Sequence, residues 1–147
     1  MLTTEDVPLS QSALLVIDAQ NSFKVGPRWA RRNNHEFERN VSALIDAYRA
    51  AGLPVIYFLH TDADPGFEPD SVHLKLMDFL SPQVNEPVLL KDTRNAFTST
   101  TLQTRLLTAG VRRCFGPTAC TGRCGWYPVP TRSASRTGRR RFMLVWP

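Results

Sequence analysis

Short apolar runs alternate with one amphipathic stretch in the first part of the chain. Residues 12–17, 53–59 and 88–90 are short runs rich in Leu, Val and Ile, as in strands buried on both faces of a parallel sheet. Apolar side chains at 37, 41, 44, 45 and 48 form one stripe of a helix. Gly52 and Pro54 end that helix. The order strand, helix, strand predicts a right-handed βαβ crossover and hence an α/β fold.

Two further helices and a loop are predicted from weaker patterns. A short helix beginning at Asp70 or Ser71 would bury apolar side chains at 72, 76, 79 and 80. Another would begin at Thr100 or Thr101, bury Leu102, Leu106 and Leu107, and end at Gly110. Residues 24–34 form a mixed stretch that we expect to fold as a loop over a site.

The charge of the chain is unevenly distributed. Its 147 residues fit one domain with a buried core, and the formal net charge is +5. Residues 1–111 hold ten basic and 13 acidic side chains, whereas residues 112–147 hold eight arginines and no acid. The basic character therefore belongs to the last quarter alone, and it does not describe the globular part.

Three polar side chains follow the predicted strands. Asp18, His60 and Lys91 each stand where an apolar run stops. In an open α/β sheet, ligands bind outside the carboxyl ends of the strands. We therefore expect these three side chains to face one crevice.

The strand pattern breaks after Val111. Pro117 is hostile to a central strand, and the residues that follow are mainly Arg, Pro, Gly, Ser, Cys and Trp. We divide the chain into residues 1–111 and a basic tail, 112–147, which we expect to be irregular. Without a fourth strand, one flank of the first strand would be an open sheet edge.

Two segments resemble the isochorismatase-like cysteine hydrolases, which include nicotinamidases. Val16-Ile17-Asp18-Ala19-Gln20 with Phe23 is similar to the opening motif of that superfamily. The second segment runs from Lys91 to Val111 and matches the lysine segment of the superfamily at Asn95, Phe97, Thr100, Leu102, Leu106 and Gly110. The resemblance covers about residues 10–111. It implies a three-layer α/β/α fold with a parallel Rossmann-like sheet, here incomplete on the C-terminal side.

The resemblance also implies a catalytic triad of Asp, Lys and Cys that cleaves a small amide or related C–N bond. Asp18 would take the thiol proton, and Lys91 would order the carboxylate and the thiolate. Gln20, Phe23 and His60 would contact the small-molecule substrate. His60 and Asp62 lack the Asp-x-His pattern with a distant second His that zinc would need, so neither a metal nor a cofactor is expected.

The nucleophile is the least well supported member of the triad. Cys124 stands 33 residues after Lys91, which is the spacing that the resemblance implies, and Thr121 fits the turn. The other residues before it match neither the expected strand nor the turn, and Cys114 and Cys120 lie nearby. We therefore expect this chain to have low or no activity.

A shifted reading frame near residues 111–114 would explain the tail. Codons for residues 113–118 read one nucleotide later can spell Val-Val-Ser-Gly-Leu-Gln, close to the expected strand. A genuine basic arm is the rival hypothesis, since Arg139, Arg140 and Arg141 lie among aromatic residues. No nucleic-acid motif accompanies them, so we do not expect a nucleic-acid partner.

Three other expectations remain open. A vinyl-ether hydrolase of the isochorismatase type, which would use Asp18 without a thiol, is an alternative function, and an inactive remnant of the fold is another. The resemblance implies homo-oligomers, which the altered tail could prevent. No apolar run reaches the length of a membrane helix and no signal peptide is evident, so we expect a cytoplasmic protein.

Overall fold

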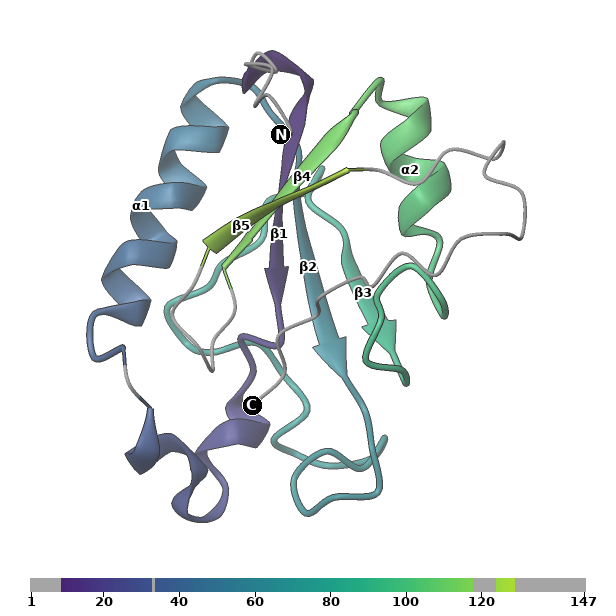
Figure 1. Cartoon of the computed structure of the whole chain (residues 1–147). Coiled ribbons are helices and arrows are strands. Elements are labelled where there is room, and N and C mark those ends of the chain that lie inside the picture. Colours follow the sequence, from purple (N-terminus) through teal and green to yellow (C-terminus); the bar gives the residue numbers. More distant parts are fainter. Residues whose placement is uncertain (1–8, 33, 118–123, 129–147) are drawn as a thin grey trace, which may run out of the picture.

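A five-stranded sheet with the strand order β3-β2-β1-β4-β5 forms the centre of the molecule (Figure 1). The computed structural model describes residues 9–32, 34–117 and 124–128. The first four strands in chain order run parallel to one another, and β5 is antiparallel to β4. The strands are β1 (Ser12–Ile17), β2 (Val55–His60), β3 (Val88–Lys91), β4 (Arg113–Pro117) and β5 (Cys124–Pro128).

The strand β1 is the central element, and its sequence explains why. Five of its six side chains are buried, as a strand covered on both faces requires. Leu14 pairs with Val55 of β2 on one side and with Phe115 of β4 on the other. The predicted strand at residues 12–17 is confirmed with the same bounds.

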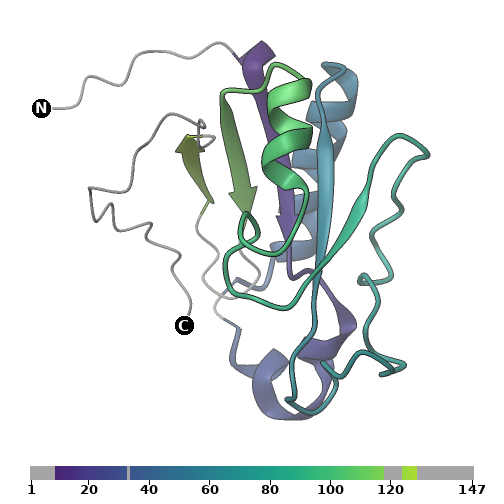
Figure 2. The same cartoon turned by 90° about the vertical axis from the view of Figure 1, so that its right-hand side faces the viewer.

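Two helices cover opposite faces of the sheet (Figures 1 and 2). Helix α1 (Phe37–Ala50) packs on the face that includes Leu14, Val16 and Tyr57. Helix α2 (Leu102–Thr108) packs on the other face, against alternate residues of the same strands such as Leu15 and Phe58. The expected three-layer α/β/α fold with a parallel sheet is confirmed.

The helix stop signals also agree with the structure. Gly52 follows α1 with a φ of +66°, and Gly110 follows α2 with a φ of +69°. Both angles lie in the left-handed region that favours glycine. The inward position predicted for Leu107 is wrong, because this side chain is exposed.

The helix predicted after residue 70 is wrong. Residues 70–80 form turns and an isolated bridge rather than a helix, and Val72 is exposed. The backbone of this segment instead serves as an extended partner: Leu76 bridges to Gln20, and the Met77 N–H donates to the Ala19 carbonyl at 3.0 Å. Three of the four residues that produced the false helical pattern, Leu76, Phe79 and Leu80, pack in or against the α1 core.

Two parts of the tail that was expected to be irregular form strands, β4 and β5, while residues 118–123 and 129–147 lie outside the described residues. Residues of β4 pair with β1 from Ser12 to Leu14, so that flank of β1 is covered. Pro117 is the last residue of β4 and pairs with Cys124 at the start of β5. A proline that ends a strand removes only the last donor of the ladder, which is why it is tolerated here. The division of the chain at residue 111 stays a prediction.

The loop predicted at residues 24–34 begins with short helical turns. One 3-10 helix spans Asn21–Lys24 and another spans Gly26–Arg31. A third, Leu9–Gln11, precedes β1. Within the described residues, no helix combines the length and the apolar character that crossing a membrane requires.

Candidate active site

Asp18 lies directly after β1, at the carboxyl edge of the sheet. Its backbone φ is +59°, and it is the only residue other than glycine with a positive φ among those that the structure describes. Side chains other than those of Asn and Asp rarely adopt this left-handed conformation. The turn takes the chain out of the sheet at this point, while the Asp18 N–H still donates to the Phe58 carbonyl at 3.2 Å. The carboxylate is buried.

Lys91 reaches this carboxylate from two strands away. As the last residue of β3 it stands at the same edge as Asp18, with its side chain only 1% exposed. Its Nζ lies 3.1 Å from Asp18 Oδ1 and donates a hydrogen bond to Oδ2 at 3.4 Å. It also donates to the Thr93 carbonyl at 3.3 Å. Asp18 and Lys91 therefore form a buried ion pair. Removing either partner would leave the other as an unpaired buried charge, which is strongly destabilising.

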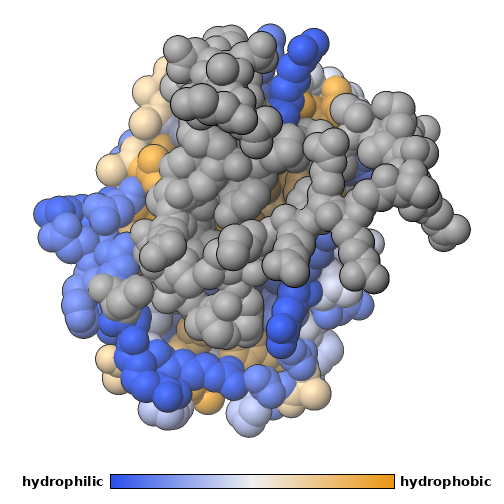
Figure 3. Space-filling model, viewed as in Figure 1, coloured by the Kyte–Doolittle hydropathy of each residue, from blue (hydrophilic) through white to orange (hydrophobic). Residues whose placement is uncertain are grey.

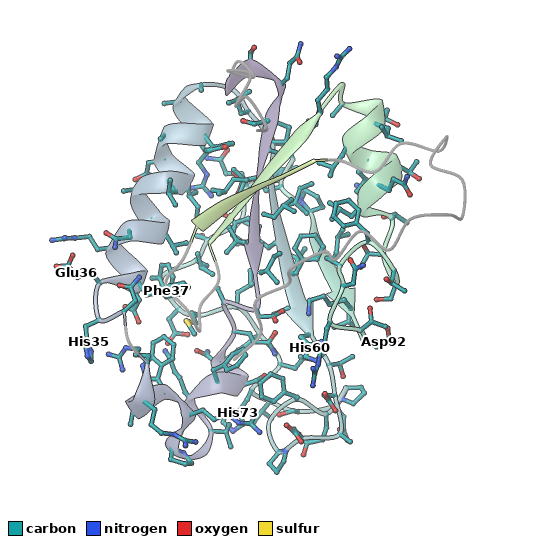
Figure 4. All side chains as sticks on the ribbon, viewed as in Figure 1. His35, Glu36, Phe37, His60, His73 and Asp92 are labelled. Carbon is teal, nitrogen blue, oxygen red and sulfur yellow. The ribbon has the colours of Figure 1, made fainter. Side chains whose placement is uncertain are left out.

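His60 ends β2, between Asp18 and Lys91 in strand order. Figure 4 shows it at the carboxyl end of that strand. Its ring is buried, and Nε2 lies 3.5 Å from Asp62 Oδ2. A hydrogen bond from the Ala63 N–H holds the pKa of the Asp62 carboxyl below its usual value, and the neighbouring His60 lowers that pKa further. His60 is thus placed at the edge where the sequence predicts it, while its contact with substrate stays a prediction.

Gln20 is bonded within the protein at the carboxyl edge of the sheet. Its side chain is fully buried, and both ends of its amide are bonded within the protein. Oε1 accepts from the His60 N–H at 2.6 Å, whereas Nε2 donates to the His60 carbonyl and to Ser22 Oγ, each at 2.8 Å. These hydrogen bonds link the ends of β1 and β2, and the expected contact of Gln20 with substrate stays a prediction.

Phe23 is also largely buried, and it packs on a residue that the sequence did not single out. Its ring meets Phe67 edge to face, with the centroids 5.0 Å apart. Phe67 in turn lies 6.2 Å from the His60 ring, centroid to centroid, and under the Arg28 guanidinium. Arg28 pairs with Asp64 at 2.8 Å. The sequence analysis did not single out Phe67 and Arg28, because their contacts depend on two loops meeting, which no local pattern shows.

The position of Cys124 is described for its backbone alone. Cys124 is the first residue of β5 and pairs with Pro117, the last residue of β4. Its backbone therefore lies at the carboxyl edge of the sheet, where β1 and β4 end. Its side chain, together with residues 118–123 and hence Cys120, lies outside the described residues. The roles assigned to the triad stay predictions.

The face of the molecule drawn in Figure 3 is mixed in polarity. Hydrophilic side chains gather along the left and lower margins of the face drawn in Figure 3. In the part of the chain that the structure describes, no group of three or more His, Cys, Asp and Glu side chains is arranged to hold a metal ion.

Comparison with known proteins assigns the family. The model of the isochorismatase domain matches residues 12–115, which include β1 to β3, both helices and most of β4. The chain belongs to the isochorismatase family. The matched range contains Asp18 and Lys91 and ends before Cys124.

Two curated relatives are similar to this member of the isochorismatase family over part of their length. The uncharacterized isochorismatase family protein YrdC of Bacillus subtilis is 30% identical over 95 residues, which cover 63% of this chain and 50% of that protein. The secreted isochorismatase effector Isc1 of Verticillium dahliae is 33% identical over 105 residues, covering 69% of this chain and 54% of that protein. The chain thus spans about half the length of the curated relatives that it matches.

Solved structures of the isochorismatase family share the fold. A putative hydrolase of the family from Chromobacterium violaceum superposes with a TM-score of 0.66 at 28% identity, covering 75% of this chain and 57% of that one. An isochorismatase from Pseudomonas putida has a TM-score of 0.64 at 28% identity, with the same coverage.

Proposed function

We propose that the protein is a hydrolase that cleaves a small amide or related C–N bond through a cysteine acyl-enzyme. The observation that carries the proposal is the buried ion pair between Asp18 and Lys91 at the carboxyl edge of the sheet, with Nζ 3.1 Å from Oδ1. Membership of the isochorismatase family supports it. Cys124 is the proposed nucleophile, and its support is its distance in sequence from Lys91 and the backbone position of β5.

In the proposed mechanism, Asp18 acts as the base and Lys91 stabilises the thiolate. Asp18 takes the proton of the Cys124 thiol, and the nearby ammonium of Lys91 favours the thiolate. The thiolate adds to the amide carbonyl, and collapse of the adduct breaks the C–N bond as the leaving amine takes the proton from Asp18. Water then hydrolyses the thioester, and its proton restores the thiol. Backbone N–H groups near the nucleophile would stabilise the oxyanion.

A second candidate needs no thiol. The Asp18–Lys91 pair is complete without any cysteine, and relatives are named isochorismatases. Asp18 would then supply the proton for hydrolysis of a vinyl ether of the isochorismate type. The third hypothesis is an inactive remnant of the fold. In that case the basic arm of the tail could serve as a binding segment.

One experiment separates these functions. The purified chain and its variants Asp18→Asn, Lys91→Met and Cys124→Ala are assayed against a panel of small amides and against isochorismate. For the first proposal, amide turnover is low but measurable and is lost in all three variants, whereas Cys114→Ala and Cys120→Ala keep it. Amide turnover that survives in Cys124→Ala contradicts the proposed nucleophile. Isochorismate turnover that survives in Cys124→Ala and not in Asp18→Asn favours the second candidate.

Assembly and location are also proposed rather than shown. The resemblance implies a homo-oligomer, which the altered tail could prevent in this chain, and light scattering of the purified chain tests this by molar mass. The cytoplasmic location expected from the sequence stays a prediction, which cell fractionation tests.

A further inference from the structure

Backbone pairing between β1 and β2 stops one residue before the site. The last pair in register is Ile17 with Phe58. Asp18 then turns out of the sheet with its positive φ, after a last donation from its N–H to the Phe58 carbonyl. From this point the ordinary ladder cannot hold the end of β2 against the end of β1.

The Gln20 side chain replaces the missing ladder. Its amide presents one acceptor and one donor to the backbone of a single residue, as a strand would, and binds the His60 N–H at 2.6 Å and the His60 carbonyl at 2.8 Å. We call these two hydrogen bonds the Gln20 rungs. The side chain is fully buried, so water cannot substitute for them.

The next contact carries this link to Lys91. His60 pairs in register with Lys91 of β3, and the Thr61 N–H donates to the Lys91 carbonyl at 2.9 Å. The Lys91 ammonium then returns across β2 to Asp18. Asp18, Gln20, His60 and Lys91 therefore form a closed chain of contacts, in which the Gln20 rungs and the Asp18 N–H bond join the end of β1 to the end of β2.

We propose that Gln20 is a positioning residue, which fixes the end of β2 against β1 and thereby sets the separation of the Asp18 carboxylate and the Lys91 ammonium. Errors of about 1 Å at a catalytic pair reduce rates by about 100-fold, so a link of this kind affects chemistry and not only stability. The catalytic meaning of the inference rests on the proposed function, while the positioning itself does not.

The test uses the variant Gln20→Met, which keeps the volume and removes both rungs. Amide hydrogen exchange measured by NMR is expected to accelerate about 10-fold at His60, because one buried hydrogen bond is lost, and to stay unchanged at Phe58. Acetylation of Lys91, measured by mass spectrometry relative to the exposed Lys24 and Lys75, is expected to rise about 5-fold as its ion pair loosens. Where amide turnover is measurable, kcat falls and KM does not.

Two control variants separate positioning from general stability. Ser22→Ala removes one partner of Gln20 and leaves both rungs, so Lys91 acetylation should match the wild type. Glu86→Gln weakens the ion pair of Glu86 with Arg49 and so lowers stability without touching the site. When its loss of stability equals that of Gln20→Met, the rate of Lys91 acetylation should still match the wild type. Unchanged acetylation in Gln20→Met, or an equal rise in Glu86→Gln, overturns the inference. Absence of all turnover in the wild type refutes the proposed function and leaves the acetylation result decisive for Gln20.

Discussion

At the scale of single residues, Lys91 carries a charge that the core tolerates only because Asp18 faces it. Removing the ammonium leaves a buried carboxylate with its main partner gone. Breaking a buried pair from one side costs several kcal/mol, whereas removing both charges costs much less.

Lys91→Met is therefore expected to lower the free energy of unfolding by about 3 kcal/mol, measured by urea denaturation at pH 7. The double variant with Asp18→Asn should recover part of that loss. Lys75→Met, at an exposed lysine, serves as the control and should change stability by less than about 0.5 kcal/mol. A loss below about 1 kcal/mol in Lys91→Met would show that the pair is not buried as described.

Tyr57 gives the core a dependence on alkaline pH. Its hydroxyl is buried and lies 3.2 Å from Glu86 Oε2. Burial, and then the negative charge of Glu86, raise the pKa of Tyr57 from 10.0 to about 12. The folded protein thus holds this proton more tightly than the unfolded chain, so stability is retained below pH 10 and is lost as the pH rises towards 12.

Tyr57→Phe should remove this component. Between pH 9 and pH 12 the wild type should lose on the order of 2 kcal/mol more than the variant, measured by urea denaturation at each pH. Parallel losses in the two proteins would mean that Tyr57 ionises as easily in the folded state as in the unfolded chain.

At the scale of elements, two loops at the carboxyl edge fit each other closely. Gly66 has a φ of +89°, and a Cβ at this position would lie 2.7 Å from Val25 Cγ2. The contact seats the loop that carries Phe67 against the segment after β1. A side chain at position 66 would have to push the loops apart.

Gly66→Ala is expected to destabilise the protein by about 2 kcal/mol or more, since strain from positive φ and a steric clash combine. Gly52→Ala is the matched control, because Gly52 also has a positive φ but has nothing within 4 Å of the added Cβ. It should cost only about 1 kcal/mol. Equal melting temperatures for the two variants, measured by calorimetry, would contradict the close approach at Gly66.

Elements and site residues differed in how far the sequence could reveal them. The runs at β1, β2 and β3 were recognisable because strands buried on both faces must be apolar throughout. Asp18, His60 and Lys91 followed from one rule, that parallel strands end at a common edge. The role of Gln20 could not be predicted, since it depends on a contact 40 residues away in sequence. The helix predicted after residue 70 was wrong for a related reason. Apolar residues of this segment are spaced as on a helix, although they pack against the α1 core from turns.

At the scale of the whole molecule, β4 closes the flank of β1. It pairs with β1 through Ser12, Ala13 and Leu14, although its own sequence carries little of the usual strand pattern. An unpaired central strand would offer its backbone to other chains.

A chain that ends at Val111 is therefore expected to aggregate, measured by size-exclusion chromatography with light scattering. A chain that ends at Pro128 retains β4 and β5 and should remain dispersed. A monodisperse product from the shorter chain would show that β4 does not protect this edge. The shifted reading frame stays a hypothesis, and the nucleotide sequence through the codons for residues 110–124 tests it.

The left-handed turn at Asp18 also restricts what protein engineering can place there. A saturation library at this position would return folded proteins mainly for Asp, Asn and Gly, because β-branched and bulky side chains oppose a φ of +59°. Selection for a new reaction would then have to change the neighbours of position 18, since the chain permits almost no chemical variety at the position itself.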